Sequence, residues 1–584
     1  MALRADTMGG NAGQNVSGVG SAAIRFEPDG YLLSGPKLMG RQAAGNAFLR
    51  AVVAGRQEQP LWAYTPNSNS AGIFRAMVHT LDAAAETRWL PADRLDLLGQ
   101  IGTLYLPGPG LADSARLRLR AGPAAYSLCG VTHTTASHRA MGDITGLLTA
   151  PVMPWDALIC TSSAVAGTVK LLLETEIAAL RWRFGPSIAV TLPRLPVIPL
   201  GVHCDDFAFP AREREAARAA LGIAADEVVA LFVGRLSFHA KAHPHPMYAG
   251  LQAAAQRTGR KLVLIQSGWF ANGHIEQAFR DGAAQTCPDV RALFTDGKDL
   301  DRRRESWAAA DIFVSLSDNI QETFGLAPIE AMSAGLPVVV TDWDGYKDTV
   351  RDGVDGFRIP TWMVPPDGEP FARGYEAGID TYDLYCGLTC ATVSVDMQAL
   401  IERLSELVSN PGLRQRMGDA GRQRAREIFD WRVVYRRYQI LWAELADHRQ
   451  AARRDPQGQA LLAAAPRAAA SSMDPFRGFA HYPTATIKAD TRVFLVAGAD
   501  AAAYAKLALH PLFSYAAKVL PAQAVVEALV ACLTGADPVI QDLAMQDLAM
   551  QDLATRTGLE LGGTMLAVSI LAKMGLVRMR SADG

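Results

Sequence analysis

Short apolar runs alternate with longer alanine-rich stretches between Val228 and Ile359. The runs are four to eight residues long and read VVALFVG, KLVLIQSG, RALFT, DIFVSLS, LPVVVT and GFRI. Continuous apolar runs of this length are typical of parallel strands that helices cover on both faces. The segments between them, such as MYAGLQAAAQRTG, have the length and alanine content of helices. This part of the chain is therefore predicted to be a doubly wound α/β domain.

The first part of the chain repeats this alternation less regularly. Its strand candidates are GYLLSG, PLWAYT, GTLYLPG, AAYSLCGV and DALICTS, and amphipathic stretches such as SAGIFRAMVHTLDAA separate them. We therefore expect a second Rossmann-like domain, joined to the other near residues 199–210, where LPVIPL enters a turn region with Gly, Asp and Pro. After Asp430, WRVVYRRYQILWAELADHRQ predicts a long amphipathic helix that returns across the gap between the domains.

The last part of the chain differs in composition. Residues 449–472 are rich in Ala, Arg and Pro, which is typical of a linker. The later repeat LAMQDLAMQDLA has a period that fits neither a solenoid nor a heptad, and TMLAVSILAKMGLVRMR is similar to the final helix and strand of a winged-helix module. The expected parts are a flexible tail (1–24), two Rossmann-like domains (25–205 and 206–448), a linker (449–486) and a small, mainly helical domain (487–584).

Composition narrows the class of protein. The 584 residues are 49% hydrophobic and 20% charged, as in a folded globular protein, and the net charge of -2 gives no broad positive field for nucleic acid. We expect no nucleic-acid partner. No uninterrupted apolar run is long enough to span a membrane, although peripheral contact with one stays open. Seven cysteines, without a signal-like apolar stretch near the start, indicate reduced thiols and a cytoplasmic location.

The segment ADIFVSLSDNIQETFGLAPIEAMSAGLPVVVT holds two carboxylates around a strand-to-helix turn. It is predicted to leave a strand at Ser315 and to start a helix near Pro328, because proline is favoured in a first helical turn. Glu322 is then in the loop and Glu330 in the first turn. Free amides at a helix N-terminus suit a phosphorylated ligand. The backbone that approaches them belongs to Thr323, Phe324, Gly325 and Leu326.

These two carboxylates have two interpretations. In the first, they accept hydrogen bonds from sugar and ribose hydroxyls. In the second, Glu330 complements the helix dipole and Glu322 is a solvated loop charge. Spacing alone supports both equally. However, Ala327 stands where a Ser or Thr would complete a capping box with Glu330, so the capping explanation lacks its partner.

A pair of cations follows the opening strand of the same domain. In ALFVGRLSFHAKAHP, Gly234 and Arg235 leave the strand and Lys241 comes six residues after Arg235. Arginine grips phosphate oxygens in a bidentate fork and lysine adds a compact charge, so the pair suits a diphosphate leaving group without a metal. The alternative is two ordinary surface cations. Their place after a central strand favours the ligand site.

Both segments resemble a known family. QETFGLAPIEAMSAGLPVVVTDWDG resembles the E-x7-E region of retaining GT-B enzymes of glycosyltransferase family 4, and GRLSFHAK is similar to their phosphate clamp, with Ala242 where a glycine often follows the lysine. The resemblance covers about residues 25–445. It implies a GT-B fold, with an N-terminal acceptor domain and a C-terminal nucleotide-sugar domain facing a cleft. It also implies that Glu322 contacts the transferred sugar and Glu330 the ribose hydroxyls.

The resemblance extends to the N-terminal domain. Family members carry a glycine-rich loop that faces the donor phosphates, which makes Gly40, Arg41 and Gln42 of SGPKLMGRQAAG candidates. His133, in SLCGVTHTTAS, resembles the family histidine that contacts the donor sugar. From the residues alone, a plain tight turn explains the glycines equally well. A single histidine is more often structural than functional, but His133 is predicted at a strand end, where open α/β sheets bind ligands.

Two clusters suggest a metal site at first sight. They are His239, His243 and His245, and Asp342, Asp344 and Asp348. The histidines have no carboxylate or cysteine at useful spacing, and Pro244 and Pro246 rigidify their loop so that successive side chains splay apart. We therefore expect them to line the cleft or face solvent. The aspartates suit a solvated turn. We expect neither a metal nor another cofactor.

The sequence thus predicts a glycosyltransferase, specifically a retaining hexosyltransferase. By resemblance it moves a sugar from a nucleotide-diphosphate donor to a glycan, lipid or protein acceptor. The leaving diphosphate helps to remove the acceptor's proton. Two alternatives stay open: an inactive GT-B scaffold that acts through its C-terminal module, and a sugar-nucleotide epimerase on the same fold. The nucleotide base, the sugar, the acceptor and the oligomeric state are not indicated.

Overall fold

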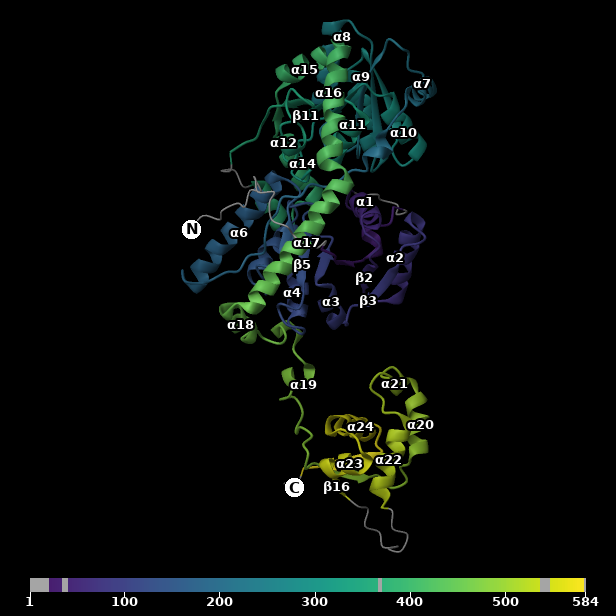
Figure 1. Cartoon of the computed structure of the whole chain (residues 1–584), viewed down its shortest axis with the longest axis vertical. Coiled ribbons are helices and arrows are strands. Elements are labelled where there is room, and N and C mark those ends of the chain that lie inside the picture. The colour runs from purple at the N-terminus through teal and green to yellow at the C-terminus, as the bar shows by residue number, and fades with distance from the viewer. Residues whose placement is uncertain (1–19, 34–39, 366–369, 536–546, 582–584) are drawn as a thin grey trace. The chain divides into compact units, whose positions relative to one another are not determined.

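The computed structural model describes residues 20–33, 40–365, 370–535 and 547–581. The chain forms two compact units, residues 1–469 and residues 470–584. The first unit contains two six-stranded parallel sheets, each covered by helices, and Figure 1 shows it in purple to green. The second contains a small antiparallel sheet with helices.

The N-terminal sheet has the strand order β3-β2-β1-β4-β5-β6. All of its pairings are parallel. Its strands are β1 (Ala23–Arg25), β2 (Leu61–Thr65), β3 (Thr87–Pro91), β4 (Thr103–Leu106), β5 (Ser127–Val131) and β6 (Ala157–Ile159). Its helices are α1 (Gly40–Ala54), α2 (Ser68–Leu81), α3 (Leu95–Ile101), α4 (Ala112–Arg118), α5 (His138–Thr145) and α6 (Ser163–Phe184).

Four of the five strands expected in this domain are present, and the expectation for GYLLSG is wrong in its described part. Residues 28–30 form a 3-10 helix and Tyr31 a turn, because Pro28 starts the helix and the Tyr31 ring packs against Phe26. Ser34 and Gly35 lie outside the described residues. The pattern also missed β1, which is only three residues long, and the edge strand β3, whose Arg88 and Trp89 are exposed.

The C-terminal sheet has the order β12-β11-β10-β7-β8-β9 and is also parallel. All six strands predicted from the apolar runs are confirmed: β7 (Val228–Val233), β8 (Leu262–Gly268), β9 (Val290–Asp296), β10 (Ile312–Ser315), β11 (Val338–Thr341) and β12 (Gly356–Ile359). A short antiparallel pair, β13 (Thr361–Trp362) and β14 (Ser394–Val395), follows them later in the chain.

Helices cover both faces of this second sheet and bury two separate clusters of apolar residues. They are α7 (Ala211–Ala220), α8 (His245–Thr258), α9 (Gly273–Thr286), α10 (Leu300–Ala309), α11 (Leu326–Ala334), α12 (Tyr346–Thr349), α15 (Met397–Ser409) and α16 (Pro411–Arg424). Two further helices, α13 (Pro370–Glu376) and α14 (Tyr382–Ala391), contact each other. Two Rossmann-like domains that face one another form the GT-B arrangement, so the predicted fold class is confirmed.

The helix expected after Asp430 is α17 (Trp431–Arg454), and it crosses from one Rossmann-like domain to the other. It follows α16 through a π-helical turn, residues 425–429, and then contacts α1 and β5 (Figure 1). Trp431, Tyr435, Tyr438 and Trp442 are buried in the core of the N-terminal domain. The apolar stripe read from the sequence therefore joins the two domains.

Part of the segment expected to be a linker is helical instead. α17 continues to Arg454, and α18 (Pro456–Ala463) follows. Arg449 is buried in the first unit, where its Nη1 donates to the main-chain oxygen of Gly102 at 2.5 Å and to Ser127 Oγ at 2.6 Å. These partners, which are far away in sequence, satisfy the hydrogen-bond donors of a buried guanidinium group. The composition of the segment had predicted a linker, in which this side chain would be exposed.

The second unit has a three-stranded antiparallel sheet with the order β16-β15-β17. Its elements are α19 (Pro475–Gly478), β15 (Arg492–Leu495), α20 (Ala501–Leu509), α21 (Pro511–Ser514), α22 (Gln523–Thr534), β16 (Leu548–Ala549), α23 (Met550–Thr557), α24 (Leu561–Lys573) and β17 (Val577–Arg580). The first copy of the AMQDL repeat lies mostly outside the described residues. The winged-helix interpretation stays a prediction.

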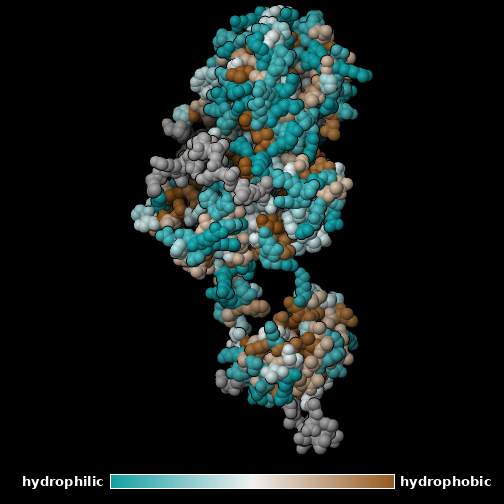
Figure 2. Space-filling view, viewed as in Figure 1, coloured by the Kyte–Doolittle hydropathy of each residue, from teal (hydrophilic) through white to brown (hydrophobic). Residues whose placement is uncertain are grey.

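Exposed apolar side chains occur on both units. In the first unit, α6 exposes Leu171, Trp182 and Phe184, and Figure 2 shows apolar surface in the region of this helix. In the second unit, Leu509 and Tyr515 are each 83% exposed. Among the helices of the described residues, none has the length and apolar character that crossing a membrane requires.

Candidate functional site

A cavity of about 350 Å³ lies where the carboxyl ends of the two sheets face each other. Its walls come from α1 and the loop after β5 on one side, and from the loops after β7, β8, β9 and β10 on the other. Among the sequence-predicted residues, it brings together Gly40, His133, Gly234, Arg235, Lys241, Glu322, Thr323, Phe324, Gly325, Leu326 and Glu330. Arg41 belongs to α1, but its side chain is not described, and Gln42 does not line the cavity.

An ion pair joins the two sequence motifs inside this cavity. Lys241 Nζ, from the loop after β7, donates to a carboxylate oxygen of Glu322, from the loop after β10. Burial acts to raise the pKa of Glu322, but the charge and hydrogen bond of Lys241 and the backbone amides of Thr323 and Phe324 bring that pKa below its ordinary value. Glu322 is therefore ionised at neutral pH.

Cations outnumber carboxylates among the described residues that line the cavity. Arg235, Lys241 and Arg303 face Glu322 and Glu330. Arg235 Nη2 donates to the main-chain oxygen of Ala240 at 2.9 Å, which ties the loop between the two motif cations together. The remaining positive charge favours an anionic ligand.

Helix α11 starts earlier than the sequence suggested, which moves Glu330. Its first residue is Leu326, so Glu330 lies in the second turn and not in the first. The reason is Gly325, whose left-handed φ of 80° lets the chain turn into the helix without a side-chain cap. Arg303, from α10, lies 3.5 Å from the Glu330 carboxylate. Burial raises the pKa of Glu330, and the charges of Arg303 and Lys241 act in the opposite direction.

The turn before α11 has room only for glycine. A Cβ at Gly325 would overlap the ring of Tyr346, and Tyr346 is fully buried. No side chain caps the first turn of α11. Its amides are therefore left for a ligand, as expected at the N-terminus of a helix beside a cavity.

Sequence reasoning missed several cavity residues. Gly268 and Gly297 line it at the ends of β8 and β9. Their signal was present, because LIQSG and FTDG repeat the strand-then-glycine pattern of FVG. A Cβ at Gly268 would overlap the main-chain oxygen of Gly234, so these strand ends pack without side chains. Arg303 had no local signal, because its partner Glu330 lies on another helix.

The N-terminal domain holds the loop that carries Glu322. Ser162 Oγ donates to the main-chain oxygen of Thr323 at 2.8 Å, and Thr323 Oγ1 donates to the main-chain oxygen of His133 at 2.5 Å. His133 thus stands at the cavity directly against the Glu322 loop.

A second cavity of about 180 Å³ adjoins the first and shares Ala44, His133 and Leu200 with it. It lies within the N-terminal domain and α17. Its other walls combine two carboxylates with aromatic rings, from Glu27, Asp29, Tyr31, Phe48, Tyr105, Trp431 and Tyr438. The Tyr31 hydroxyl and the Trp431 indole nitrogen are buried without a hydrogen-bond partner among the described residues.

The two clusters considered for a metal have other surroundings. His239, His243 and His245 do not line the main cavity, and His243 and His245 are exposed, which agrees with one of the two expectations for them. Within the described part of the chain, no three His, Cys, Asp or Glu side chains are grouped so as to hold a metal ion.

The expectation of a solvated turn is wrong for Asp344. Its φ is 45°, and its Oδ2 is buried without a partner in the described chain. Burial, together with the negative charge of Glu322, raises the pKa of this carboxyl to about 8. Asp348 is also engaged, because its Oδ2 accepts from the Ser163 amide at 2.5 Å.

Comparison with known proteins finds similarity centred on the C-terminal domain. Residues 213–363 match the family model of glycosyl transferases group 1. D-inositol 3-phosphate glycosyltransferase of Nocardia farcinica is 33% identical over 168 residues, which cover 28% of this chain and 36% of that protein. Spore coat protein SA of Bacillus subtilis is 26% identical over 228 residues, covering 38% of this chain and 50% of that protein. The chain thus spans about half, or less, of the length of these relatives.

A solved structure of Anabaena HepE in complex with UDP-glucose is 15% identical, with a TM-score of 0.45; the likeness covers 74% of this chain and 100% of that one. The family match contains the two motifs that meet in the main cavity, with Arg235 and Lys241 in one and Glu322 and Glu330 in the other. The segment that supplies most of the candidate site, residues 213–363, is therefore similar to glycosyl transferases of group 1.

Proposed function

We propose that this protein is a glycosyltransferase that moves a hexose from a nucleoside diphosphate sugar to an acceptor hydroxyl, with retention of anomeric configuration. The observation that carries the proposal is the ion pair of Lys241 and Glu322 inside a cavity that both Rossmann-like domains line. The family match over residues 213–363 supports it.

In this scheme, the donor diphosphate binds at the first turn of α11, near Arg235 and Lys241. Free helix amides and two cations stabilise the negative charge that develops on the leaving diphosphate. Because these groups supply the positive charge, the scheme requires neither a metal ion nor another cofactor.

The two glutamates then have separate tasks. Glu330, held by Arg303, accepts hydrogen bonds from the ribose hydroxyls, and the ionised Glu322 accepts one from the sugar that is transferred. The acceptor oxygen attacks the anomeric carbon on the face that the diphosphate leaves, and a diphosphate oxygen takes the acceptor's proton. The sugar–phosphate bond breaks as the new glycosidic bond forms.

The acceptor occupies the second cavity in this proposal. His133 belongs to both cavities, so a ligand in the second one reaches the place where the donor sugar lies. Aromatic faces such as Phe48 and Trp431 pack against the apolar side of a sugar-like ring, and Glu27 and Asp29 accept hydrogen bonds from its hydroxyls.

The test measures nucleotide release and product formation with UDP-, GDP- and ADP-glucose in the presence of EDTA. We expect turnover with one nucleotide series, and a loss of at least about 100-fold in Glu322→Gln, because transition-state contacts of this kind contribute that much. Glu305→Gln is the matched control, since Glu305 is half-buried on α10 beside Arg302 and lies outside the cavity.

Three outcomes would contradict the proposal. No turnover and no thermal stabilisation by any donor would favour an inactive scaffold. Epimerised donor without transfer would indicate an epimerase. An absolute requirement for a divalent ion would remove the role given to Arg235 and Lys241. Anomeric configuration is read from the proton spectrum of the product.

A further inference from the structure

A further cavity, of about 340 Å³ and lined by charged side chains, lies at the other end of the strands of the C-terminal sheet. Its lining includes Val228, the first residue of β7, and Asp311, which directly precedes β10. Arg260 lies just before β8. The cavity is therefore at the amino ends of these strands, whereas the candidate donor site lies at their carboxyl ends. The catalytic scheme uses none of its residues.

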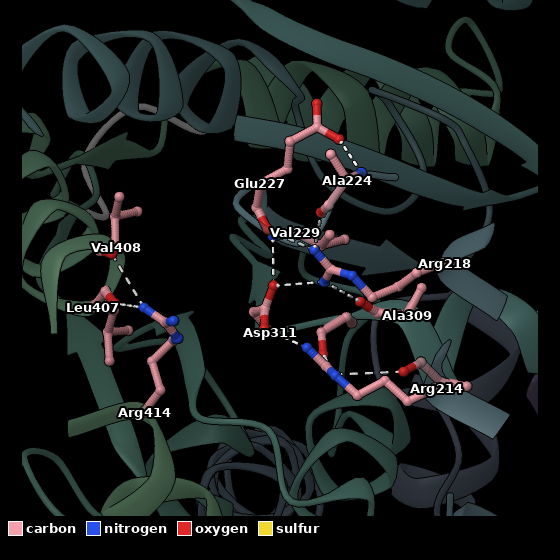
Figure 3. Close-up of polar contacts among 12 residues, drawn as sticks. Arg214, Arg218, Ala224, Glu227, Val229, Ala309, Asp311, Leu407, Val408 and Arg414 are labelled. Carbon is pink, nitrogen blue, oxygen red and sulfur yellow. Dashed lines mark hydrogen bonds and ion pairs between the residues drawn. The ribbon is translucent and has the colours of Figure 1, made fainter. Parts of the chain in front are cut away.

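The central carboxylate of this cavity is already neutralised. Asp311 accepts from Arg214 Nη2 at 2.5 Å, from Arg218 Nη1 at 3.2 Å and from the amide of Val229 at 2.9 Å. Figure 3 shows Arg214 and Arg218 converging on Asp311. These two arginines tie α7 to the sheet, which is a structural role.

The other two carboxylates that line the cavity also have cationic partners. Asp226 lies 3.2 Å from Lys261 Nζ, and Glu227 lies 3.2 Å from Arg291 Nη2. Neither Lys261 nor Arg291 is part of the lining. The acidic groups of the cavity therefore have their own compensation.

Two cations of the lining have no carboxylate partner among the described residues, namely Arg260 and Arg414. Arg414 donates through Nη1 to the main-chain oxygens of Leu407 at 2.7 Å and Val408 at 3.1 Å, at the C-terminus of α15. In Figure 3 it stands across from Asp311. These bonds engage one of its three nitrogens, so a bidentate edge stays open to a ligand.

The setting of Arg414 is electrostatically unfavourable. Burial lowers the pKa of its guanidinium, and the nearby charges of Arg214 and Arg260 lower it as well, while Asp311 offsets part of the effect. A positive group that is half-buried beside like charges gains stability when an anion binds between them.

We propose that this cavity binds a phosphorylated small molecule, with its phosphate group held by Arg260 and Arg414. Guanidinium groups recognise phosphate through paired N–H donors. The volume exceeds what a phosphate ion fills and falls in the range of small-molecule sites. The shared chemistry is the phosphate dianion, which free phosphate or a phosphorylated metabolite supplies.

The experiment uses the full chain and measures binding by calorimetry, with thermal stability as a second readout. The probes are inorganic phosphate and glucose 6-phosphate. We expect both to bind, with glucose 6-phosphate at least threefold tighter because its sugar fills the remaining volume. Arg260→Glu should weaken binding at least tenfold. Arg260 is exposed, so this substitution leaves the fold intact, and Arg257→Glu, near the end of α8 but outside the lining, should leave binding unchanged.

Binding of a probe at the donor cavity is distinguished by Arg235→Gln, which removes only that contribution and should leave the binding that Arg260→Glu abolishes. A response lost in Arg235→Gln and kept in Arg260→Glu would overturn the proposal, as would no binding of either probe. Equal affinity for the two probes would overturn the small-molecule part and leave a site for free phosphate. Because Arg235 and Arg260 belong to different cavities, failure here is distinct from failure of the proposed transferase activity.

Discussion

The hydroxyl of Thr323 donates to the main-chain oxygen of His133 at 2.5 Å, across 190 residues of sequence. Thr323 directly follows Glu322, and His133 lies in the loop just after the end of β5. The bond therefore fixes the loop of one Rossmann-like domain against the strand end of the other. It also connects two residues that became candidates for different reasons. Thr323 belongs to the loop before the predicted helix, and His133 resembles a family histidine.

Removing this hydroxyl should weaken both the fold and the site. In Thr323→Val the shape is kept but the part-buried oxygen of His133 loses its donor, which costs about 1 kcal/mol of the free energy of unfolding. Thr323→Ser keeps the donor and should restore most of the stability and the turnover. Urea unfolding and initial rates check this. A larger loss in Thr323→Ser than in Thr323→Val would show that the methyl group, and not the hydrogen bond, matters.

Arg303 should affect donor affinity through Glu330. Arg303→Gln removes the cation beside this half-buried carboxylate, so the carboxylate binds a proton more readily and the ribose loses an acceptor. We expect KM for the donor to rise about tenfold, which corresponds to about 1.4 kcal/mol, with a smaller change in kcat. Arg302→Gln, on the same helix and paired with Glu305, should change neither value. A fall in kcat alone would argue against ribose binding.

The turn before α11 should tolerate no side chain. In Gly325→Ala the new Cβ meets the ring of buried Tyr346, in addition to the strain of a left-handed φ. Gly353→Ala is the control, because Gly353 has a φ of 73° and no atom near its would-be Cβ. Thermal unfolding should show a distinctly larger loss for Gly325→Ala. Similar losses would mean that backbone strain alone sets the cost.

Asp344 should make stability depend on pH. Its pKa is about 8 in the folded chain, against an ordinary value of 3.8, so between these values the folded state holds a proton that the unfolded state releases. The stabilisation from this group is therefore complete below its ordinary pKa of 3.8. It is lost as the pH rises through the pKa of about 8 that the group has in the folded chain. Asn cannot ionise and tolerates the positive φ.

We expect Asp344→Asn to raise Tm relative to the wild type by at least about 2 °C more at pH 8.5 than at pH 5. Thermal unfolding at both pH values measures the difference. A shift of the same size at the two values would show that the carboxyl is ionised throughout. Asp342→Asn, which replaces a neighbour 3.5 Å from Arg358, controls for the loss of a negative charge in this loop.

Local sequence patterns predicted every strand of the C-terminal sheet but not every strand of the N-terminal sheet. Strands β7 to β12 are continuous apolar runs because helices cover both faces of the sheet. Such runs can be recognised in the sequence without knowing which strands lie next to them. β1 is too short and β3 too exposed to give that signal. The start of α11 was misplaced because proline marks a first turn only approximately, while Gly325 sets the start through its φ.

The sequence by itself determined the fold class, the crossing helix after Asp430 and the loops that carry Arg235, Lys241 and Glu322, since periodicity and turn chemistry are local properties. Only the tertiary structure decided which side chains meet. It paired Lys241 with Glu322 and Arg303 with Glu330. Such contacts depend on the register and packing of elements far apart in the chain, and a one-dimensional pattern does not record that register.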